Sequence, residues 1–348
     1  MKTANLLTIV FLIVLTAINS SAQNQTGTVK NSDSVEQAII TAQNLLKKGD
    51  AAGALSILQT AAQKYPKNDV VKFWLGKTFY SQGNYQKTIE VLNLLADKFP
   101  KNSAEQMQTV QMLGLSHYIL GHLAEAIPNF EKLMQWQPEN NEMAYALGVS
   151  YIQTRQPEKS RQTFAKLFNV PTNSASAYLL NAKMQMRQQF EETAEVELNK
   201  ALELDPKLPD VRFVLGELAI YHAEIDKGIE FLKQEIALNP SNSMAYYRLG
   251  EGLSRQLKWD EAIPPLQKSI WLNPFFSGPY IVLGKVYLKK QDYGNAESML
   301  RRSTMIDPNN FGAHYLLAQV LQQTGKAEEA KAEFALAEKL RGNNEKAP

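Results

Sequence analysis

Few residues in this 348-residue chain could support metal or nucleophilic chemistry. Cysteine is absent, which excludes disulfides, thiolate nucleophiles and cysteine-ligated zinc. The four histidines include His117 and His122, which are five residues apart and do not share one face of a helix as a metal-binding pair would. Neither G-x-x-x-x-G-K-[ST] nor H-E-x-x-H occurs, so the sequence predicts no phosphate-binding loop and no zinc protease site.

Two pairs of adjacent glutamates have the residue type used in general acid–base catalysis, Glu191–Glu192 and Glu328–Glu329. Each pair stands at the start of a predicted helix, where carboxylates favour the positive end of the helix dipole and face solvent. The chain has 37 Lys and Arg residues and 35 acidic residues, which gives a formal net charge of +2. This charge is too small for the whole chain to bind nucleic acid by electrostatic attraction. We therefore predict a protein that is not an enzyme, has no nucleic-acid partner and needs no cofactor or metal.

The elements that would position any site follow a repeat of 34 residues. Glycines occur at intervals of 38, 34, 68, 34 and 34 residues, at Gly76, Gly114, Gly148, Gly216, Gly250 and Gly284. A small residue follows each glycine by 12 positions, a large apolar residue by 16 and, in most cases, a proline by 24. This spacing predicts pairs of helices that stack, because no single pair can bury its own apolar face.

These residues resemble the tetratricopeptide repeat, a helix–turn–helix unit with the pattern W-x2-L-G-x2-Y, then A-x3-F, then P. The resemblance covers nine units, at residues 35–68, 69–102, 107–140, 141–174, 175–208, 209–242, 243–276, 277–310 and 311–344. The leading Trp is absent from its position, and residues 103–106 are an insertion of about one helical turn. The resemblance implies an all-α fold, a right-handed α-solenoid of about nine 34-residue helix–turn–helix repeats with a concave side.

Repeat positions, counted from the first residue of each unit, predict local features. Position 15 lies between the two helices and favours a left-handed C-cap where it holds glycine, at Gly49, Gly83, Gly121 and Gly325. Ser103 and Gln106 have the spacing of a capping box, which predicts that the insertion lengthens the first helix of the third unit. His117 and His314 occupy positions of core aromatic residues, so we expect structural roles for them.

A stripe on the first helix of each unit lies at positions 2, 5, 6, 9, 12 and 13, by the 3.6-residue geometry of a helix. In the family this stripe lines the groove that holds extended peptides, and here it is rich in aromatic, apolar and charged residues. The candidate groove residues are Phe73, Lys77, Tyr80, Tyr118, Tyr145, Arg187, Phe213, Glu217, Tyr247, Arg248, Glu251, Arg255, Ile281, Lys285, Lys289 and Tyr315. The alternative is that neighbouring first helices bury the residues at position 5 and that the charged residues are only solvated.

Charge is uneven along this stripe. The first four units balance to zero, whereas units five to eight carry six basic residues against three acidic ones, a balance of +3. Arg248 and Lys285 come from successive first helices and should point toward one channel. We expect a partner with acidic side chains or a free carboxylate there, anchored by apolar contacts to residues such as Tyr247. Glu251 and Arg255 are four residues apart, and the alternative is that they pair only with each other.

The N-terminal residues 1–22 have the features of a secretory signal peptide. The apolar block Leu6–Ile18 is shorter than the ~20 residues that a membrane span needs, and the small residues Ser20–Ala22 precede the expected cleavage site. We expect an exported protein, periplasmic or secreted, and the alternative is anchoring by an uncleaved N-terminal segment. The composition predicts a flexible polar spacer at 23–34 and a polar tail at 345–348.

These patterns favour a non-enzymatic scaffold or adaptor of the cell envelope. Its partner would be a protein or an extended peptide in the concave groove, and no membrane span would remain after signal cleavage. The alternative is a structural self-assembly module that forms homo-oligomers through the exposed ends of its repeats. The two hypotheses differ in whether the groove or the ends of the solenoid contact the partner.

Overall fold

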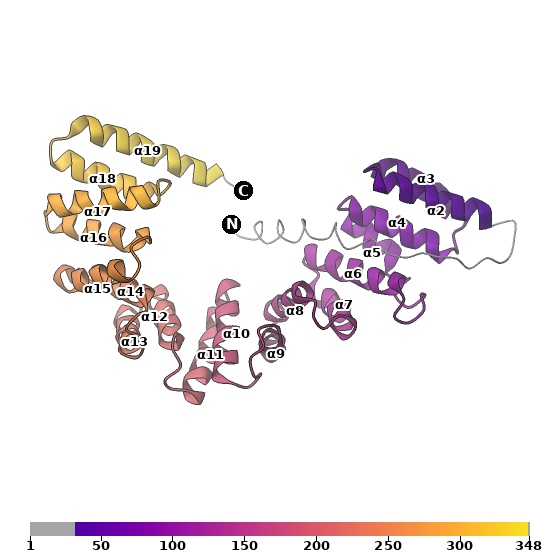
Figure 1. Cartoon of the computed structure of the whole chain (residues 1–348), viewed down its shortest axis with the longest axis horizontal. Helices are drawn as coiled ribbons and strands as arrows, with labels where there is room; N and C mark the ends of the chain where they lie inside the picture. The colour runs from indigo at the N-terminus through magenta and orange to yellow at the C-terminus, as the bar shows by residue number, and fades with distance from the viewer. Residues whose placement is uncertain (1–31, 347–348) are drawn as a thin grey trace. The chain divides into compact units, whose positions relative to one another are not determined.

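The computed structural model describes residues 32–346, which form 18 α-helices and no strand. The helices follow one another in antiparallel pairs (Figure 1), as the prediction of an all-α helix–turn–helix repeat requires. The predicted signal peptide (1–22) and most of the predicted spacer lie outside the described residues. Helix α2 begins at Ser32 and α19 continues to Lys346, so short parts of the predicted spacer and tail are helical instead. No helix in the described part of the chain is long and apolar enough to cross a bilayer.

The described residues up to Leu204 form one compact unit. Its described helices are α2 (Ser32–Lys47), α3 (Ala51–Lys64), α4 (Asp69–Ser81), α5 (Tyr85–Leu92), α6 (Ala104–Ile119), α7 (Leu123–Trp136), α8 (Asn141–Gln153), α9 (Pro157–Leu167), α10 (Ala175–Arg187) and α11 (Glu191–Leu204). The two helices of each pair pack against each other, and the second helix also packs on the first helix of the next pair. This arrangement lets each apolar face be covered from both sides.

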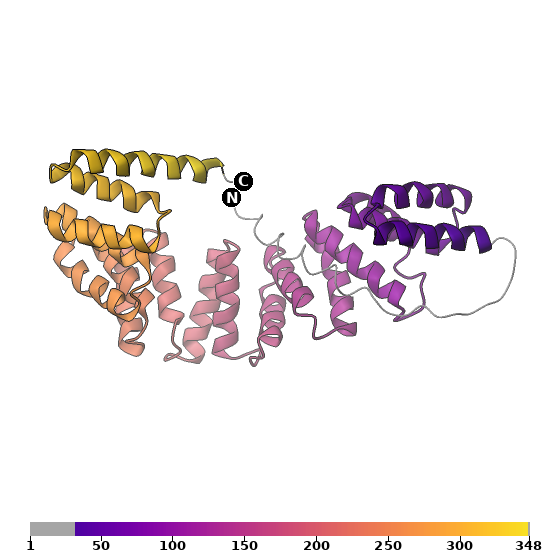
Figure 2. The same ribbon diagram turned by 45° about the horizontal axis from the view of Figure 1, so that its top comes forward.

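Residues 205–348 belong to a second compact unit. Its described helices are α12 (Val211–Tyr221), α13 (Ile225–Leu238), α14 (Ser243–Arg255), α15 (Trp259–Leu272), α16 (Ser277–Lys289), α17 (Tyr293–Ile306), α18 (Phe311–Gln323) and α19 (Ala327–Lys346). The packing within and between pairs follows the same scheme as in residues 23–204. Figure 2 shows the last pair, α18 and α19, lying side by side.

The turn between the helices of each pair contains one residue with left-handed backbone. The glycines predicted for this role have φ between 72° and 82°, at Gly49, Gly83, Gly121 and Gly325. The other five pairs have a residue with a Cβ at the same repeat position, with φ between 57° and 64°, at Arg155, Gln189, Ala223, Leu257 and Gln291. A left-handed backbone costs about 1–2 kcal/mol for such a residue, so these five turns carry strain that glycine would relieve.

Glycine at repeat position 8 allows the second helix to approach the first closely. A Cβ added at Gly148 would lie 2.6 Å from Phe164, and one added at Gly250 would lie 2.4 Å from Leu266. Both partners are the large apolar residues found 16 positions later, and both are fully buried. The recurring glycine therefore matches the recurring large residue, because a methyl group at either of these two glycines would require the large residue to shift.

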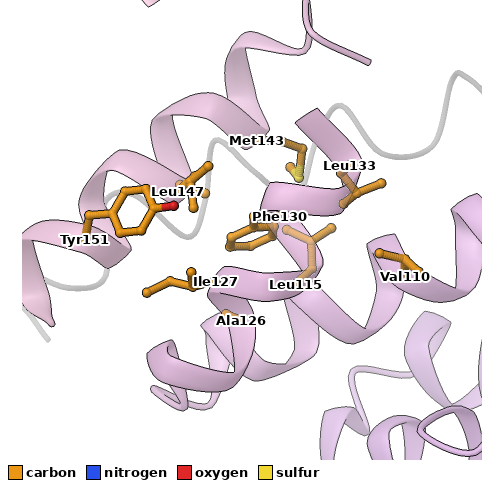
Figure 3. Packing of buried hydrophobic residues seen from close by; sticks show 10 residues of the cluster. Val110, Leu115, Ala126, Ile127, Phe130, Leu133, Met143, Leu147 and Tyr151 are labelled. Carbon is orange, nitrogen blue, oxygen red and sulfur yellow. The ribbon is translucent and has the colours of Figure 1, made fainter. Parts of the chain in front are cut away.

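The cores of successive pairs are continuous. Figure 3 shows Phe130 of α7 enclosed by Leu115 of α6 and by Met143 and Leu147 of α8. Phe130 is fully buried by this combination of three helices from two repeats. Removing one repeat would thus expose the core of its neighbour, which is why such helix pairs are stable only as an array.

Two local features distinguish the second and third repeats. The insertion lengthens α6 to 16 residues, and the hydroxyl of Ser103 accepts a hydrogen bond from the backbone N–H of Gln106 at 3.2 Å. The side chain of Gln106 accepts from the N–H of Asn102 at 2.9 Å, one residue before the N-H that a capping box uses. Helix α5 has only 8 residues, because the chain from Asn93 to Phe99 forms turns in place of two more helical turns.

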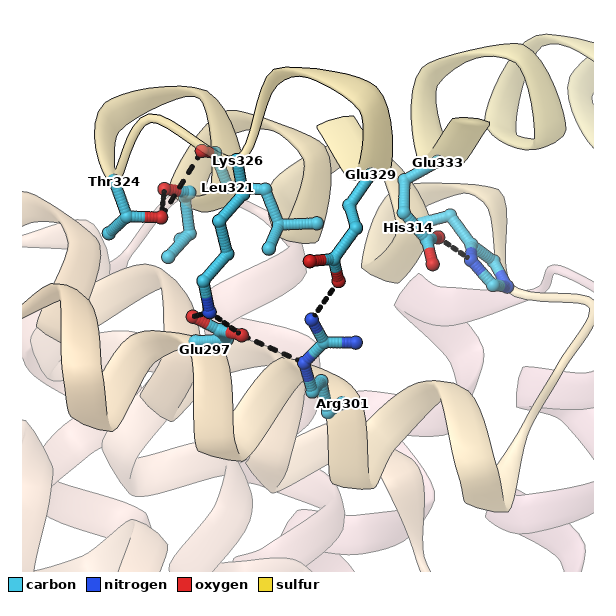
Figure 4. A network of polar contacts seen from close by, with 9 residues as sticks. Glu297, Arg301, His314, Leu321, Thr324, Lys326, Glu329 and Glu333 are labelled. Atoms are coloured by element: carbon cyan, nitrogen blue, oxygen red, sulfur yellow. Dashed lines mark hydrogen bonds and ion pairs between the residues drawn. The ribbon is translucent and has the colours of Figure 1, made fainter. Parts of the chain in front are cut away.

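Ion pairs connect the last two helix pairs, as Figure 4 shows. Arg301 of α17 donates to Glu297 at 2.9 Å and to Glu329 of α19 at 2.5 Å. Lys326, in the turn before α19, donates to Glu297 at 2.8 Å. The hydrogen bond from Lys326, joined by that from Arg301, holds the pKa of Glu297 below its ordinary value. These bonds attach α19 to the preceding repeat by charge as well as by apolar packing.

Candidate functional site

The predicted groove stripe lies on first helices that contact one another within residues 205–348. Helix α14 packs against α12 on one side and against α16 on the other, and α16 packs against α18. The stripe of each first helix therefore adjoins that of the next. This packing brings together side chains that lie about one repeat apart in the sequence, such as Glu217 and Arg248.

Arg248 is the centre of a cluster of four charged residues. Its Nε donates to Glu217 of α12 at 2.8 Å, and its Nη1 donates to Glu251 of α14 at 2.9 Å. Arg255 also donates to Glu251, at 2.9 Å, so these two residues do pair, but not only with each other, because Glu251 also binds Arg248. The two arginines balance the two glutamates. The guanidinium of Arg248 is already bound to two carboxylates and connects α12 to α14, and contact between Arg248 and a ligand stays a prediction.

Tyr247 and Phe213 contribute aromatic surface beside this cluster. The ring of Tyr247 lies edge-to-face with Phe276 at a centroid distance of 5.1 Å, and the guanidinium carbon of Arg248 is 5.1 Å from its centroid. Burial, followed by the charge of Glu251, raises the pKa of Tyr247 above its ordinary value. Phe213 is half-buried and, like Tyr247, packs against a cluster of buried apolar residues that includes Leu249. Both rings therefore present only part of their surface to a ligand.

Helix α16 carries two stripe cations whose charge is available to a ligand. Lys285 and Lys289 are exposed, and neither makes an ion pair within the described residues. Ile281 lies one turn before Lys285 and is half-buried, and Tyr315 of α18 is 49% exposed, with its ring edge-to-face on Phe334 at 5.5 Å. An ammonium group beside apolar surface can hold a carboxylate while the neighbouring part of a ligand loses water.

In the compact unit that ends at Leu204, the stripe differs from its prediction at Phe73. This residue was expected to line the groove, but it is 3% exposed and packs edge-to-face on Trp74 and Phe99. The reason is that α6 covers repeat position 5 of α4, the alternative stated for this position. The ammonium group of Lys77 already has partners within the chain. Its Nζ donates to Gln108 at 3.0 Å and lies 4.7 Å from the centroid of the Trp74 ring. Burial lowers the pKa of Lys77.

Three other candidate residues of the same compact unit are half-buried tyrosines: Tyr80, Tyr118 and Tyr145. Burial, with a smaller contribution from Tyr85, raises the pKa of Tyr80 to about 12, and burial also raises the pKa of Tyr118. Their hydroxyls make no hydrogen bond to the described part of the chain, so they are available to a polar ligand group. Arg187 is exposed at the end of α10 and has no ion pair among these residues.

The histidines do not form a chemical site. His314 is buried, with Nδ1 2.5 Å from a carboxylate oxygen of Glu333 and Nε2 3.0 Å from the carbonyl oxygen of Pro308, which agrees with its predicted structural role. Burial lowers the pKa of His117, whose ring lies 5.9 Å from that of His122. Within residues 32–346, no three His, Asp or Glu side chains come close enough together to hold a metal ion.

Polar contacts between neighbouring first helices were not predicted from the sequence. Glu217 and Arg248 are 31 residues apart, at repeat position 9 of one unit and position 6 of the next. Lys77 and Gln108 are also separated by 31 residues and join position 9 to position 2 across the insertion. A search for complementary pairs at this spacing would have found both, because the stripe residues of adjacent first helices face one another.

Comparison with known sequences identifies the repeat. A family model described as tetratricopeptide repeat matches residues 45–111, 118–184 and 287–347, which together exceed half of the chain. The chain belongs to the tetratricopeptide repeat family. Tetratricopeptide repeat proteins are generally scaffolds for protein interaction and are typically not enzymes.

Several known proteins are similar to this tetratricopeptide repeat protein. Intraflagellar transport protein 88 homolog of Homo sapiens is 28% identical over 103 residues, covering 29% of this chain and 12% of that protein. Protein O-mannosyl-transferase TMTC1 of Homo sapiens is 24% identical over 179 residues, covering 49% of this chain and 19% of that protein. The chain thus spans less than a fifth of these relatives. A solved structure of pilF from Pseudomonas aeruginosa has 18% identity and a TM-score of 0.46, covering 57% of this chain and 90% of that one.

Proposed function

We propose that this chain is a non-enzymatic scaffold or adaptor that binds a protein or an extended peptide on the stripe of α14, α16 and α18. The observation that carries the proposal is the pair Lys285 and Lys289, which are exposed without an ion-pair partner in the described range. They lie on the same helix as Ile281, and that helix packs against α18, which carries Tyr315. A ligand with acidic side chains or a free carboxylate would neutralise the two ammonium groups. Its apolar side chains would cover the neighbouring apolar surface.

The expected affinity is divided unequally between these two kinds of contact. An exposed ion pair contributes about 0–1 kcal/mol, so the two lysines alone do not hold a peptide. Burial of apolar surface contributes about 25 cal/mol per Å² before the cost of association, so side chains such as Tyr315 supply most of the binding free energy. The lysines instead select acidic ligands and accelerate association.

The proposal extends to the place of action, which we infer to be the cell envelope or the exterior. It rests on residues 1–22, whose short apolar block and small residues before position 23 are typical of a secretory signal. An envelope scaffold would meet its partner after export. Fractionation of cells that produce the full chain tests this part of the proposal separately from peptide binding.

The experiment that tests binding compares three forms of the full chain. The wild type is used to capture partners from an envelope extract, and the captured partner is then titrated by calorimetry at low and high salt. Lys285→Glu combined with Lys289→Glu should weaken binding about tenfold or more, because two attractions of up to about 1 kcal/mol each become repulsions. Lys331→Glu is the matched control, since Lys331 is exposed on α19 and has no ion pair within the described residues.

The outcome that contradicts the proposal is equally specific. If the double variant binds the captured partner as tightly as the wild type and the Lys331→Glu control, the ligand does not use α16. Replacement of Tyr80 or Tyr118 would then test the half-buried tyrosines of the first unit as the alternative binding surface. Circular dichroism of each variant shows that the helices are retained.

A further inference from the structure

Large apolar side chains face solvent at the junctions between repeats in residues 205–346. Five such residues, which we term the apolar edge, are between 41% and 79% exposed: Leu238, Trp271, Phe275, Met305 and Phe311. Phe275 and Trp271 are the most exposed of them, at 79% and 73%. Side chains of this size rarely gather on a surface that contacts only water, so the apolar edge indicates an interaction surface.

The apolar edge is one surface because of the antiparallel arrangement of the helices. Leu238 ends α13, and Trp271 and Met305 stand one residue before the ends of α15 and α17. Phe275 lies in the loop from α15 to α16, and Phe311 is the first residue of α18. Every second helix ends where the next first helix begins, so all five residues lie along the same side of the unit, at the repeat junctions.

Basic residues accompany these apolar side chains. Lys268 and Arg302 stand three residues before Trp271 and Met305, at the same repeat position in α15 and α17. The Nζ of Lys268 is 3.8 Å from the centroid of the Trp271 ring, and Arg302 is exposed with no ion pair in the described part of the chain. The first turns of α14, α16 and α18 contain no acidic residue, and Asp307 is hydrogen-bonded within its own loop. The apolar edge therefore complements an anionic partner.

The corresponding side of the first unit has a different character. Helices α4, α6 and α8 begin with the acidic residues Asp69, Glu105 and Glu142 in their first turns. An exposed aromatic residue also occurs there, Phe168 at the end of α9, which is 51% exposed. Trp271 and Phe275 are two exposed aromatic residues at one junction of the second unit, beside Lys268. Phe168 has no second exposed aromatic residue beside it among the described residues, and α10 after it also lacks an acidic first turn, so Phe168 provides a matched control for the paired aromatic residues.

We propose that the apolar edge binds the surface of a membrane that contains anionic lipid. Trp and Phe partition into the headgroup region of a bilayer, where their rings lose water and the indole N–H keeps a polar partner. Each basic residue near an anionic membrane strengthens binding about fivefold. The five side chains stand at loops and helix ends and lie apart from the stripe on α14 and α16. Membrane contact along the apolar edge therefore leaves Lys285 and Lys289 of α16 open, and it approaches the proposed peptide-binding stripe at Phe311, one turn before Tyr315.

The test uses the full chain with vesicles of phosphatidylcholine, with and without phosphatidylglycerol. Binding is measured by flotation, and the emission of Trp271 is obtained as the difference between the wild type and Trp271→Phe. Two double variants probe the two kinds of contact, Trp271→Ala with Phe275→Ala and Lys268→Glu with Arg302→Glu. The control variant is Phe168→Ala. The apolar block of residues 6–18 is present in every form, so only differences between variants are interpreted.

The expected result is a blue shift of Trp271 emission that requires phosphatidylglycerol. Reversal of both basic residues should weaken binding to anionic vesicles at least about 25-fold, from two contributions of about fivefold each, and loss of the two aromatic residues at least about tenfold. Phe168→Ala should bind like the wild type. Unchanged Trp271 emission, or an aromatic double variant that floats like the wild type, contradicts the proposal. If sedimentation shows a wild-type dimer that the aromatic variant abolishes, the apolar edge joins two copies of the chain and the membrane proposal is wrong.

Discussion

Exchanging alanine and glycine in the turns between paired helices should change stability in opposite directions in two repeats. Ala223 and Gly121 occupy the same repeat position, with φ of 64° and 77°. A Cβ added at Gly121 would meet nothing within 4 Å, and the methyl group of Ala223 is exposed, so neither exchange alters packing. We expect Ala223→Gly to stabilise the protein and Gly121→Ala to destabilise it, because only the backbone conformation distinguishes the two residues here.

The magnitude follows from two opposing free energies. A residue with a Cβ pays about 1–2 kcal/mol to adopt the left-handed conformation, whereas glycine adopts it freely. Glycine in turn gives the unfolded chain more conformational freedom, which costs about 0.5–1 kcal/mol on folding. The difference leaves about 0.5–1 kcal/mol in favour of glycine at this position. Ala332 is the matched control, since it is exposed inside α19 and its replacement by glycine should destabilise the helix by about 1 kcal/mol.

The assay is urea unfolding followed by circular dichroism, with midpoints compared at equal slope. Repeat arrays can unfold in steps, so hydrogen exchange of the amides that flank each turn provides a local measure of the same free energy. The reasoning is refuted if Ala223→Gly destabilises the chain as Ala332→Gly does, or if both turn exchanges shift the midpoint in the same direction. Either result would mean that the sign of φ does not govern stability at this position.

Three further predictions follow from other residues. Burial raises the pKa of Tyr80 in the folded chain to about 12. As the pH rises, the phenol of Tyr80 therefore ionises in the unfolded chain before it ionises in the folded one. The free energy of unfolding should fall from about pH 10 upward, by at most about 2–3 kcal/mol. Urea unfolding at neutral and alkaline pH should show a smaller fall for Tyr80→Phe. Arg161 and Glu197 form a buried ion pair at 3.5 Å. Glu197→Leu should lower the free energy of unfolding by about 3–5 kcal/mol, because it leaves the charge of Arg161 buried without a partner. Adding Arg161→Met to that variant should recover most of the loss, as measured by thermal unfolding. N-terminal sequencing of exported protein should begin at Gln23, whereas retention of residues 1–22 in a membrane fraction would favour the anchor.

Much of the fold is predictable because the repeat constrains several residue types at once. Gly148 and Phe164 show the reason, since the small residue exists to admit the large one 16 positions later, and both recur in phase. The left-handed turns were predicted only where glycine marks them. Leu257 adopts the same conformation without a sequence signal, because the packing of the flanking helices imposes it. The early end of α5 at Leu92 also has no marker in the repeat pattern.

The candidate site was less predictable, because exposure depends on what each neighbour covers. Phe73 and Tyr315 share repeat position 5, yet Phe73 is 3% exposed and Tyr315 is 49% exposed. The position fixes the face of the helix on which a residue lies, but the side chains of the adjoining elements decide whether it is buried. The apolar edge was missed for a related reason, since the reasoning followed first-helix stripes, whereas Trp271 and Phe275 lie at the junction after a second helix.

Arginine and lysine have different roles in the stripe, because their side chains differ in geometry. The planar guanidinium of Arg248 makes two bonds at once, to Glu217 and Glu251, which a rigid fork does better than a single ammonium. Lys285 and Lys289 have flexible stems and no carboxylate to hold them within the described residues, so they can follow a ligand. Reversal of Arg248 would place a third carboxylate beside two others and loosen α12 from α14, and its effect on binding would then be a consequence of lost stability. Reversal of the lysines would leave the helices in place, so a change in affinity at constant stability identifies α16 as the surface that contacts the partner.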